Sequence, residues 1–182
     1  MQVIYDEAKL TELILHLACR LAGDRDGGAI KLDKALYFGE FAHVRRHGRP
    51  ISGVTFFKRP DGPAPRRLKP VRSALIERGD AELVREDFLG YEMQRLVARR
   101  EPDLTVFDHD ELETIDRVLS DLAGLTGMQV SRLSREDAAW RLTADNDDIP
   151  YELALVPKDQ RVTPTAMRLG REAAERYGIA IP

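Results

Sequence analysis

The chain has 182 residues, of which 43% are hydrophobic and 32% charged, and its formal net charge is −3. These values are typical of an ordinary soluble protein, and the length fits one domain spanning residues 1–182. No apolar run approaches the ~20 residues that a membrane span needs, and the acidic start does not match a signal peptide. The single cysteine, Cys19, cannot form an internal disulfide, so we expect a protein of the reducing cytoplasm.

The charge is divided unevenly along the chain. Residues 45–72 hold nine lysines and arginines against one aspartate, whereas residues 101–121 hold eight acids against one arginine. Such asymmetry indicates either a charged docking face or two segments that pair with each other inside the fold. The sequence leaves both alternatives open.

The first two predicted elements are helices. Asp6 can cap a helix whose apolar residues follow the i, i+3, i+4, i+7 spacing of one buried face. These residues are Leu10, Leu13, Ile14, Leu17 and Leu21. A second helix should run from about Ile30 to His47 and end at Gly48, with the small residues Gly39 and Ala42 facing a neighbouring helix.

A change in composition follows at residue 50. β-Type residues from Pro50 to Lys58 predict a short strand, and the proline-rich residues 60–65 predict a turn. A third helix should follow over about residues 66–78, burying Leu68, Val71, Leu75 and Ile76. Two short strands around residues 81–85 and 91–98 predict a β-hairpin.

The C-terminal half is helical by pattern. Asp108 and Glu111 form a capping-box sequence before a helix with an apolar stripe of Leu112, Ile115, Val118, Leu119 and Leu122. A shorter helix near Thr126 should carry Met128, Val130 and Leu133, and a further helical piece carries Trp140. Residues 145–148 predict a solvated acidic loop, and Thr163-Pro164 predicts a last helix to about Tyr177. The predicted fold class is therefore α+β, a mostly helical single domain with a short antiparallel β-sheet or hairpin.

Motifs for catalysis or cofactor binding are missing from the sequence. No glycine-rich phosphate loop follows a strand, and no serine, cysteine or threonine lies in a nucleophile motif. Glu40, His43 and His47 share a helix face in a metal-like spacing, but the neighbouring arginines would repel a divalent ion. Asp24-Arg25-Asp26-Gly27 begins like a calcium loop but lacks its closing glutamate. We expect no enzyme activity, no catalytic residue, no cofactor and no metal.

Helices followed by a hairpin also match a second class of protein. In a winged-helix regulator, lysines and arginines of the recognition helix and of the hairpin contact phosphates. The sequence pI of about 5.9 is acidic, and no set of base-reading side chains follows Arg66 and Arg67. A DNA-binding transcriptional regulator of phage or mobile-element origin is the alternative function. Nucleic acid is the less favoured partner, although the sequence does not exclude it.

Four short blocks, in order between residues 30 and 140, resemble one family. Residues 31–38 (KLDKALYF) are similar to the K-L-x-K-L-L-Y-F helix of the Panacea domain of SocA-like antitoxins. Residues 48–51 (GRPI) resemble its G-x-P-I step, and residues 57–63 (FKRPDGP) resemble its aromatic-to-Gly-Pro turn. Residues 133–140 (LSREDAAW) resemble its L-S-H-x-x-x-x-W block. The chain departs from the family at Arg135, where the family has histidine, and at Asp61, where it has tyrosine.

The resemblance implies an antitoxin that neutralises a toxin encoded beside it by binding it. The family pairs with many unrelated toxins, and some members resemble adaptors that deliver the toxin to a protease such as a Clp-type complex. The matching blocks and the basic segment together give the candidate partner-binding residues. These are Lys34, Tyr37, Lys58, Arg59, Asp61, Gly62, Pro63, Arg66 and Arg67. Core packing is the alternative role for Tyr37, Phe38 and Trp140, whereas we expect Phe56 and Phe57 to be available at the surface.

Overall fold

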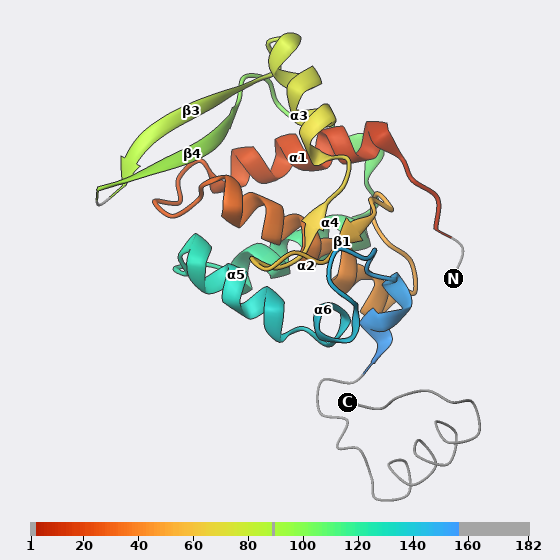
Figure 1. The fold of residues 1–182 in the computed structure, drawn as a ribbon. Coiled ribbons are helices and arrows are strands. Elements are labelled where there is room, and N and C mark those ends of the chain that lie inside the picture. Colours follow the sequence, from red (N-terminus) through yellow and green to blue (C-terminus); the bar gives the residue numbers. More distant parts are fainter. Residues whose placement is uncertain (1–2, 89, 157–182) are drawn as a thin grey trace, which may run out of the picture.

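The computed structural model describes residues 3–88 and 90–156 and shows a mostly helical α+β fold, which confirms the predicted class (Figure 1). The N-terminal elements are α1 (Glu7–Leu21), α2 (Ala29–His47), β1 (Phe56–Phe57), β2 (Ala64–Pro65) and α3 (Leu68–Glu77). The remaining elements are β3 (Ala81–Phe88), β4 (Tyr91–Ala98), η1 (Leu104–Val106), α4 (His109–Asp121), α5 (Gly127–Glu136), α6 (Ala138–Leu142) and η2 (Tyr151–Leu155). The predicted last helix at residues 163–177 lies outside the described residues.

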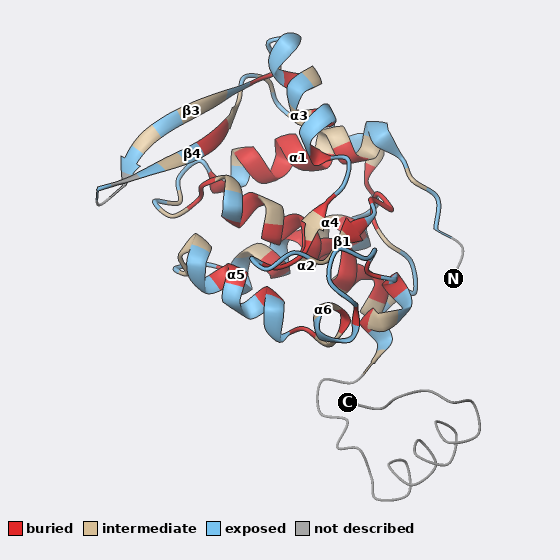
Figure 2. Ribbon diagram, in the orientation of Figure 1, coloured by how far each residue is buried: buried red, intermediate tan, exposed pale blue. Residues whose placement is uncertain are grey.

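Helices α1 and α2 supply most of the core, as the sequence predicts. The carboxylate of Asp6 accepts a hydrogen bond from the backbone N–H of Lys9 and so caps α1, and all five predicted stripe residues of α1 are buried. Gly48 ends α2 with φ 72°, a left-handed conformation that glycine adopts without steric cost. Buried residues therefore concentrate on the inner sides of these two helices (Figure 2).

An aromatic cluster joins α2 to β1 and η2. The ring of Tyr37 lies 4.4 Å from that of Phe41 and 5.3 Å from that of Phe56, measured between centroids. Phe41 also contacts Tyr151, whose hydroxyl donates a hydrogen bond to the carbonyl oxygen of Val54 at 2.7 Å. Phe56 is 0% exposed, so the expectation that it is available at the surface is wrong. Its burial follows from the place of β1 directly against α2.

The strand predicted from Pro50 to Lys58 is reduced to the two residues of β1. Residues before it cannot extend the strand because the carboxylate of Glu40 takes the backbone N–H groups of Ile51 and Ser52. Gly53 then has φ 71°, which turns the chain away from extended geometry. β1 pairs antiparallel with β2, so Ala64 and Pro65 form a strand rather than part of the predicted turn.

The second hairpin is longer than its sequence pattern predicts. β3 and β4 pair antiparallel from Ala81 opposite Ala98 to Phe88 opposite Tyr91, so β3 continues three residues past the predicted end. The hairpin extends away from the helices beside α3 (Figure 1). On α3, Leu68, Val71 and Leu75 are buried as predicted, but Ile76 is 38% exposed because it lies on the solvent face.

The C-terminal helices begin where the sequence places them. Complete capping boxes start α4, with Asp108 and Glu111, and α5, with Thr126 and Gln129. Of the three apolar residues expected on α5, only Val130 is buried, while Met128 and Leu133 are exposed. The reason is that α5 packs partly through its small hydroxyl residues, Ser131 and Ser134, which face a loop. No helix among residues 3–88 and 90–156 is long and apolar enough to cross a membrane.

Candidate partner-binding site

Residues 58–63, which connect β1 to β2, form a loop that we call the Gly-Pro loop. Its backbone is held by donors from three helices, α2, α5 and α6. The carbonyl oxygen of Arg59 accepts a hydrogen bond from Trp140 Nε1 (3.1 Å), and that of Pro60 accepts one from Arg135 Nη1 (3.4 Å). The carbonyl oxygen of Asp61 accepts a hydrogen bond from Ser131 Oγ, and that of Pro63 accepts one from Lys34 Nζ (2.7 Å). Residues far apart in sequence thus fix one short segment. Three of the four sequence blocks, residues 31–38, 57–63 and 133–140, meet at this loop.

Lys34 is the most deeply placed of these donors. Its side chain is 5% exposed, and burial lowers the pKa of its ammonium group, while the nearby carboxylates of Asp33 and Asp61 partly oppose that shift. The hydrogen bond to Pro63 gives this buried cation a fixed acceptor. Lys34 therefore supports the Gly-Pro loop from inside and does not present its charge to a partner.

Gly62 fits a position that no other residue can occupy without strain. Its φ is +103°, in the region that L side chains rarely adopt, and an added Cβ would lie 3.2 Å from Lys34 Nζ. The same Cβ would collide with Ser134 Oγ. The close approach of loop, α2 and α5 therefore depends on a glycine at this position.

Lys58 is a further anchor of the Gly-Pro loop. Its ammonium group donates to the carbonyl oxygen of Thr143 at 2.8 Å and lies 4.4 Å from the centroid of the Trp140 ring. It also pairs with the exposed carboxylate of Asp145 at 3.3 Å. Because these contacts are internal, Lys58 stabilises the loop on α6 and is not a free surface cation.

The outer face of the loop carries arginines around one aromatic ring. The half-buried Phe57 has the guanidinium of Arg66 4.5 Å from its ring centroid and that of Arg59 6.0 Å away. Arg66 pairs with Asp148, and both side chains are largely exposed. Arg59 is exposed and forms no ion pair within residues 3–88 and 90–156. Planar cations stacked on an aromatic ring form a compact surface of the type that dominates protein interfaces.

Arg67 extends this face toward the N-terminus of α1. Its guanidinium pairs with Glu7 at 3.0 Å and lies 5.7 Å from the ring centroid of Tyr5. Both members of the ion pair are more than half exposed, so the pair contributes little to stability. The charge of Arg67 thus remains accessible to solvent. We call Phe57, Arg59, Arg66 and Arg67 the arginine face.

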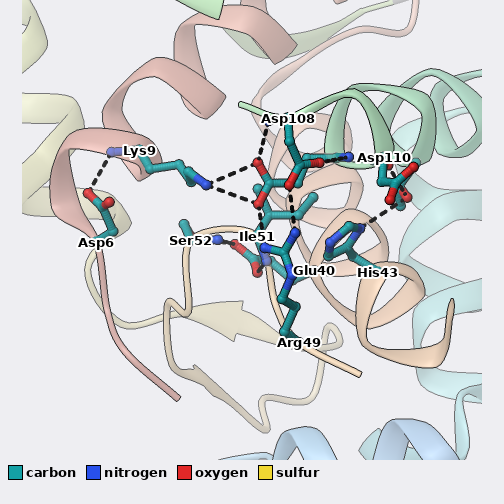
Figure 3. A network of polar contacts seen from close by, with 11 residues as sticks. Asp6, Lys9, Glu40, His43, Arg49, Ile51, Ser52, Asp108 and Asp110 are labelled. Carbon is teal, nitrogen blue, oxygen red and sulfur yellow. Dashed lines mark hydrogen bonds and ion pairs between the residues drawn. The ribbon is translucent and has the colours of Figure 1, made fainter. Parts of the chain in front are cut away.

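Pairing inside the fold accounts for part of the charge asymmetry of the sequence. Arg49 pairs with Asp108 at 2.6 Å and with Glu111 at 3.1 Å, so the start of the basic segment does bind the acidic α4 (Figure 3). Arg66 and Arg67 instead pair with carboxylates outside α4. The arginine face is therefore not consumed by pairing with that helix.

The three residues with metal-like spacing have other partners. Glu40 is 0% exposed; burial raises the pKa of its carboxyl group, while hydrogen bonds from Ser52 and Ile51 lower it (Figure 3). Its oxygens are thus directed at the backbone and not at the histidines. His43 Nδ1 lies 3.2 Å from Thr114 Oγ1, and the His43 and His47 rings stack 4.5 Å apart. In the described part of the chain no group of three or more such residues is arranged to hold a metal ion.

The calcium-like loop is also occupied by a protein cation. The guanidinium of Arg95, on β4, donates to the carbonyl oxygens of Leu21, Asp24, Arg25 and Gly27 at 3.0–3.2 Å. Asp24 in turn pairs with Lys31 at 2.6 Å. These contacts organise the connection between α1 and α2, and the ion pair with Lys31 takes the Asp24 carboxylate, which would be the first ligand of a calcium loop.

The predicted site residues therefore separate into two groups. Arg59, Arg66 and Arg67 are exposed on the arginine face, and the side chain of Asp61 is exposed beside them. Lys34, Tyr37, Lys58, Gly62 and Pro63 form the support beneath it. Sequence reasoning did not assign Ser131, Ser134 or Trp140 to the site. The LSREDAAW block contained that information, since it carries Ser134, Arg135 and Trp140.

Fold and site together define a mostly helical α+β protein with one loop whose backbone is held by three helices. The comparison with family models finds the antitoxin SocA-like Panacea domain over residues 32–141. This match covers more than half of the chain, and the chain belongs to that family. Comparison with curated proteins gave no match, and comparison with solved structures gave none either.

Proposed function

We propose that this protein is an antitoxin that neutralises a cognate toxin by binding it through the arginine face. The observation that carries this proposal is the pair of exposed arginines, Arg59 and Arg66, over the half-buried Phe57 ring, with Arg59 on a loop whose backbone is fixed from below. A fixed loop loses little conformational entropy on binding, because its ordering has already occurred during folding. The family assignment supports the same function.

The chemistry of the arginine face defines what it would bind. Arginine offers planar, multidentate donors that match carboxylates, and Phe57 offers rigid apolar area. The expected toxin surface therefore combines acidic side chains with an apolar or aromatic residue. Binding of this kind requires no catalytic group, and occlusion of the toxin is the proposed mode of action.

The β3–β4 hairpin argues against the DNA-binding alternative. A wing that contacts phosphates needs an excess of lysine and arginine. Here Glu82, Asp87 and Glu92 are exposed on the hairpin, whereas Arg95 is buried in the α1–α2 connection. The hairpin thus presents negative charge where a wing would need positive charge.

Charge reversal at Arg59 is the most direct test. When co-expressed with the product of the neighbouring open reading frame, the wild-type protein should rescue growth, whereas Arg59→Glu should not. Because Arg59 has no ion pair within the described residues, the melting temperature of the Arg59→Glu variant should stay close to that of the wild type. Arg85→Glu, an equal charge change on the exposed hairpin, is the matched control and should rescue fully.

The double variant Arg66→Glu/Arg67→Glu tests the remainder of the face. The ion pairs of Arg66 with Asp148 and of Arg67 with Glu7 are exposed to solvent and contribute little to stability, so the variant should remain folded. Loss of rescue without loss of folding supports the proposal. Full rescue by a folded variant refutes the arginine face as the binding surface.

A further inference from the structure

A groove lies between α2, α4 and α5, on the side of α5 that does not face the Gly-Pro loop. Its volume is about 330 Å³. The apolar lining comes from Phe38 and Ala42 of α2, Val118 and Leu122 of α4, and Leu133 of α5. Leu133 is 38% exposed, so this lining is open to solvent at the side of α5. An apolar groove between helices on a protein surface is a common binding site for a partner helix.

Polar residues around the groove give it a negative charge. Arg45 and Asp137 neutralise each other at 2.5 Å, and Arg45 also donates to the carbonyl oxygen of Ala154. Glu136 has only the exposed Arg132 as its ion-pair partner, 3.6 Å away. Asp121 forms no ion pair in the part of the chain that the structure describes. Two acids therefore remain available beside the apolar lining.

We propose that this groove binds an amphipathic helix of the toxin, with an apolar face flanked by lysine or arginine. This inference rests on the proposed function and names a second contact for the same partner. Apolar side chains of the helix would bury against Phe38, Leu122 and Leu133, and its cations would pair with Asp121 and Glu136. The arginine face and the groove carry opposite charges, so a partner that covers both needs an acidic patch beside a basic helix.

Helix α5 connects the two surfaces. Ser131 and Ser134 face the Gly-Pro loop, whereas Leu133 and Glu136 line the groove. One short helix thus supports the Gly-Pro loop on one side and lines the groove on the other.

A pair of synthetic helical peptides tests the groove with the full-length protein. Both carry leucines at i, i+3, i+4 and i+7; one carries lysines at the flanking positions and the other carries glutamates. Fluorescence anisotropy should show binding of the lysine peptide at least about tenfold tighter than that of the glutamate peptide. Equal affinities, or no binding of either peptide, overturn the inference.

Two variants of α5 locate the contact. Leu133→Glu places a charge in the groove and should abolish binding of the lysine peptide. Met128→Glu, at a position that is 82% exposed and does not line the groove, should leave binding unchanged. Equal loss of peptide binding in both variants overturns the inference. If light scattering instead shows a wild-type dimer that Leu133→Glu converts to a monomer, the inference is also overturned, and the groove is assigned to another copy of the chain.

Growth rescue separates this inference from the proposed function. If Arg59→Glu abolishes rescue and Leu133→Glu retains it fully, the arginine face stands and the groove assignment fails. If the wild type itself does not neutralise the neighbouring gene product, the proposed function fails, and the peptide measurement still decides whether the groove binds a basic helix.

Discussion

Lys34 of α2 donates a hydrogen bond to the carbonyl oxygen of Pro63 across 2.7 Å, although 29 positions separate the two residues in the sequence. This contact connects α2 to the Gly-Pro loop, which carries Arg59 of the arginine face. A buried ammonium group is costly unless it has an acceptor, and a buried carbonyl oxygen is costly without a donor. Each residue therefore satisfies the other, and the loop position is fixed as a result.

Lys34→Met should destabilise the protein by about 1–3 kcal/mol, because it keeps much of the side-chain volume and leaves the carbonyl oxygen of Pro63 without a donor. Urea unfolding measures the loss, and hydrogen exchange should show faster opening of the Gly62 amide, which donates to Arg59. Lys69→Met, at an exposed position of α3, is the control and should change neither quantity. An unchanged Gly62 amide in Lys34→Met would show that the loop is held without this contact.

The proposal that residues 1–182 form one domain predicts cooperative unfolding. Leu36 of α2 and Ile115 of α4 are each 1% exposed and belong to the same core cluster. Truncation of either to alanine should cost about 2–5 kcal/mol and shift a single transition. Leu142→Ala, at a position that is 61% exposed, should cost far less. Two separated calorimetric transitions in the wild type would contradict the proposal.

The contribution of His43 to stability should fall when the pH drops from about 6.5 to about 4, because burial lowers the pKa of His43 from 6.5 to about 4. In that window the unfolded chain binds a proton that the folded protein does not, so protonation favours unfolding. The difference corresponds to roughly 3 kcal/mol. Asp33 acts in the opposite direction, since burial raises its pKa to about 6 and its contribution is lost as the pH rises.

Urea titrations across this range isolate the histidine. His43→Gln keeps a donor for Thr114 and removes the His43 contribution, so between pH 6.5 and 4 its free energy of unfolding should change more favourably than that of the wild type. His109→Gln changes an exposed histidine at the start of α4 and should preserve the slope of the wild type. A variant His43→Gln with the full slope would place the proton uptake elsewhere.

Arg95→Met should disorder the connection between α1 and α2. The substitution leaves the carbonyl oxygens of Leu21, Asp24 and Gly27 without their shared donor, at an expected cost of about 1.5–3 kcal/mol. Hydrogen exchange at the Gly27 amide, which donates to Asp24, reports the change directly. Arg85→Met on the same hairpin is the control, because Arg85 has only a distant, exposed ion pair. Equal exchange in both variants would contradict this role for Arg95.

Helix positions could be predicted from the sequence because local groups determine them. Asp6, Asp108 and Thr126 cap helices through hydrogen bonds within three residues, and Gly48 ends α2 through its own backbone conformation. Errors arose where a distant group overrides a local pattern. The strand after Pro50 is shortened because Glu40, ten or more residues earlier, accepts the amides that a strand would use.

Burial on α5 and the division of the site residues could not be predicted for the same reason. Leu133 has the spacing of a core residue, yet α5 turns its serines toward the Gly-Pro loop and leaves Leu133 in a groove. Lys58 and Arg59 are neighbours with the same charge, but within the described residues only the Lys58 side chain donates to a carbonyl oxygen, that of Thr143. Tertiary neighbours decide whether a charged residue supports the loop or lies exposed at the surface, and composition and spacing hold no information about these neighbours.

The contacts that hold the Gly-Pro loop engage carbonyl oxygens, which every residue possesses, and not the side chains of residues 59–61. Substitutions at these three positions can therefore change the shape and charge offered to a partner while the frame stays intact. Gly62 is the exception, since Lys34 and Ser134 leave no room for a side chain. Residues that maintain the fold are thus separate from those that would contact the partner under the proposed function. New specificities can then evolve without the loss of stability that usually accompanies them.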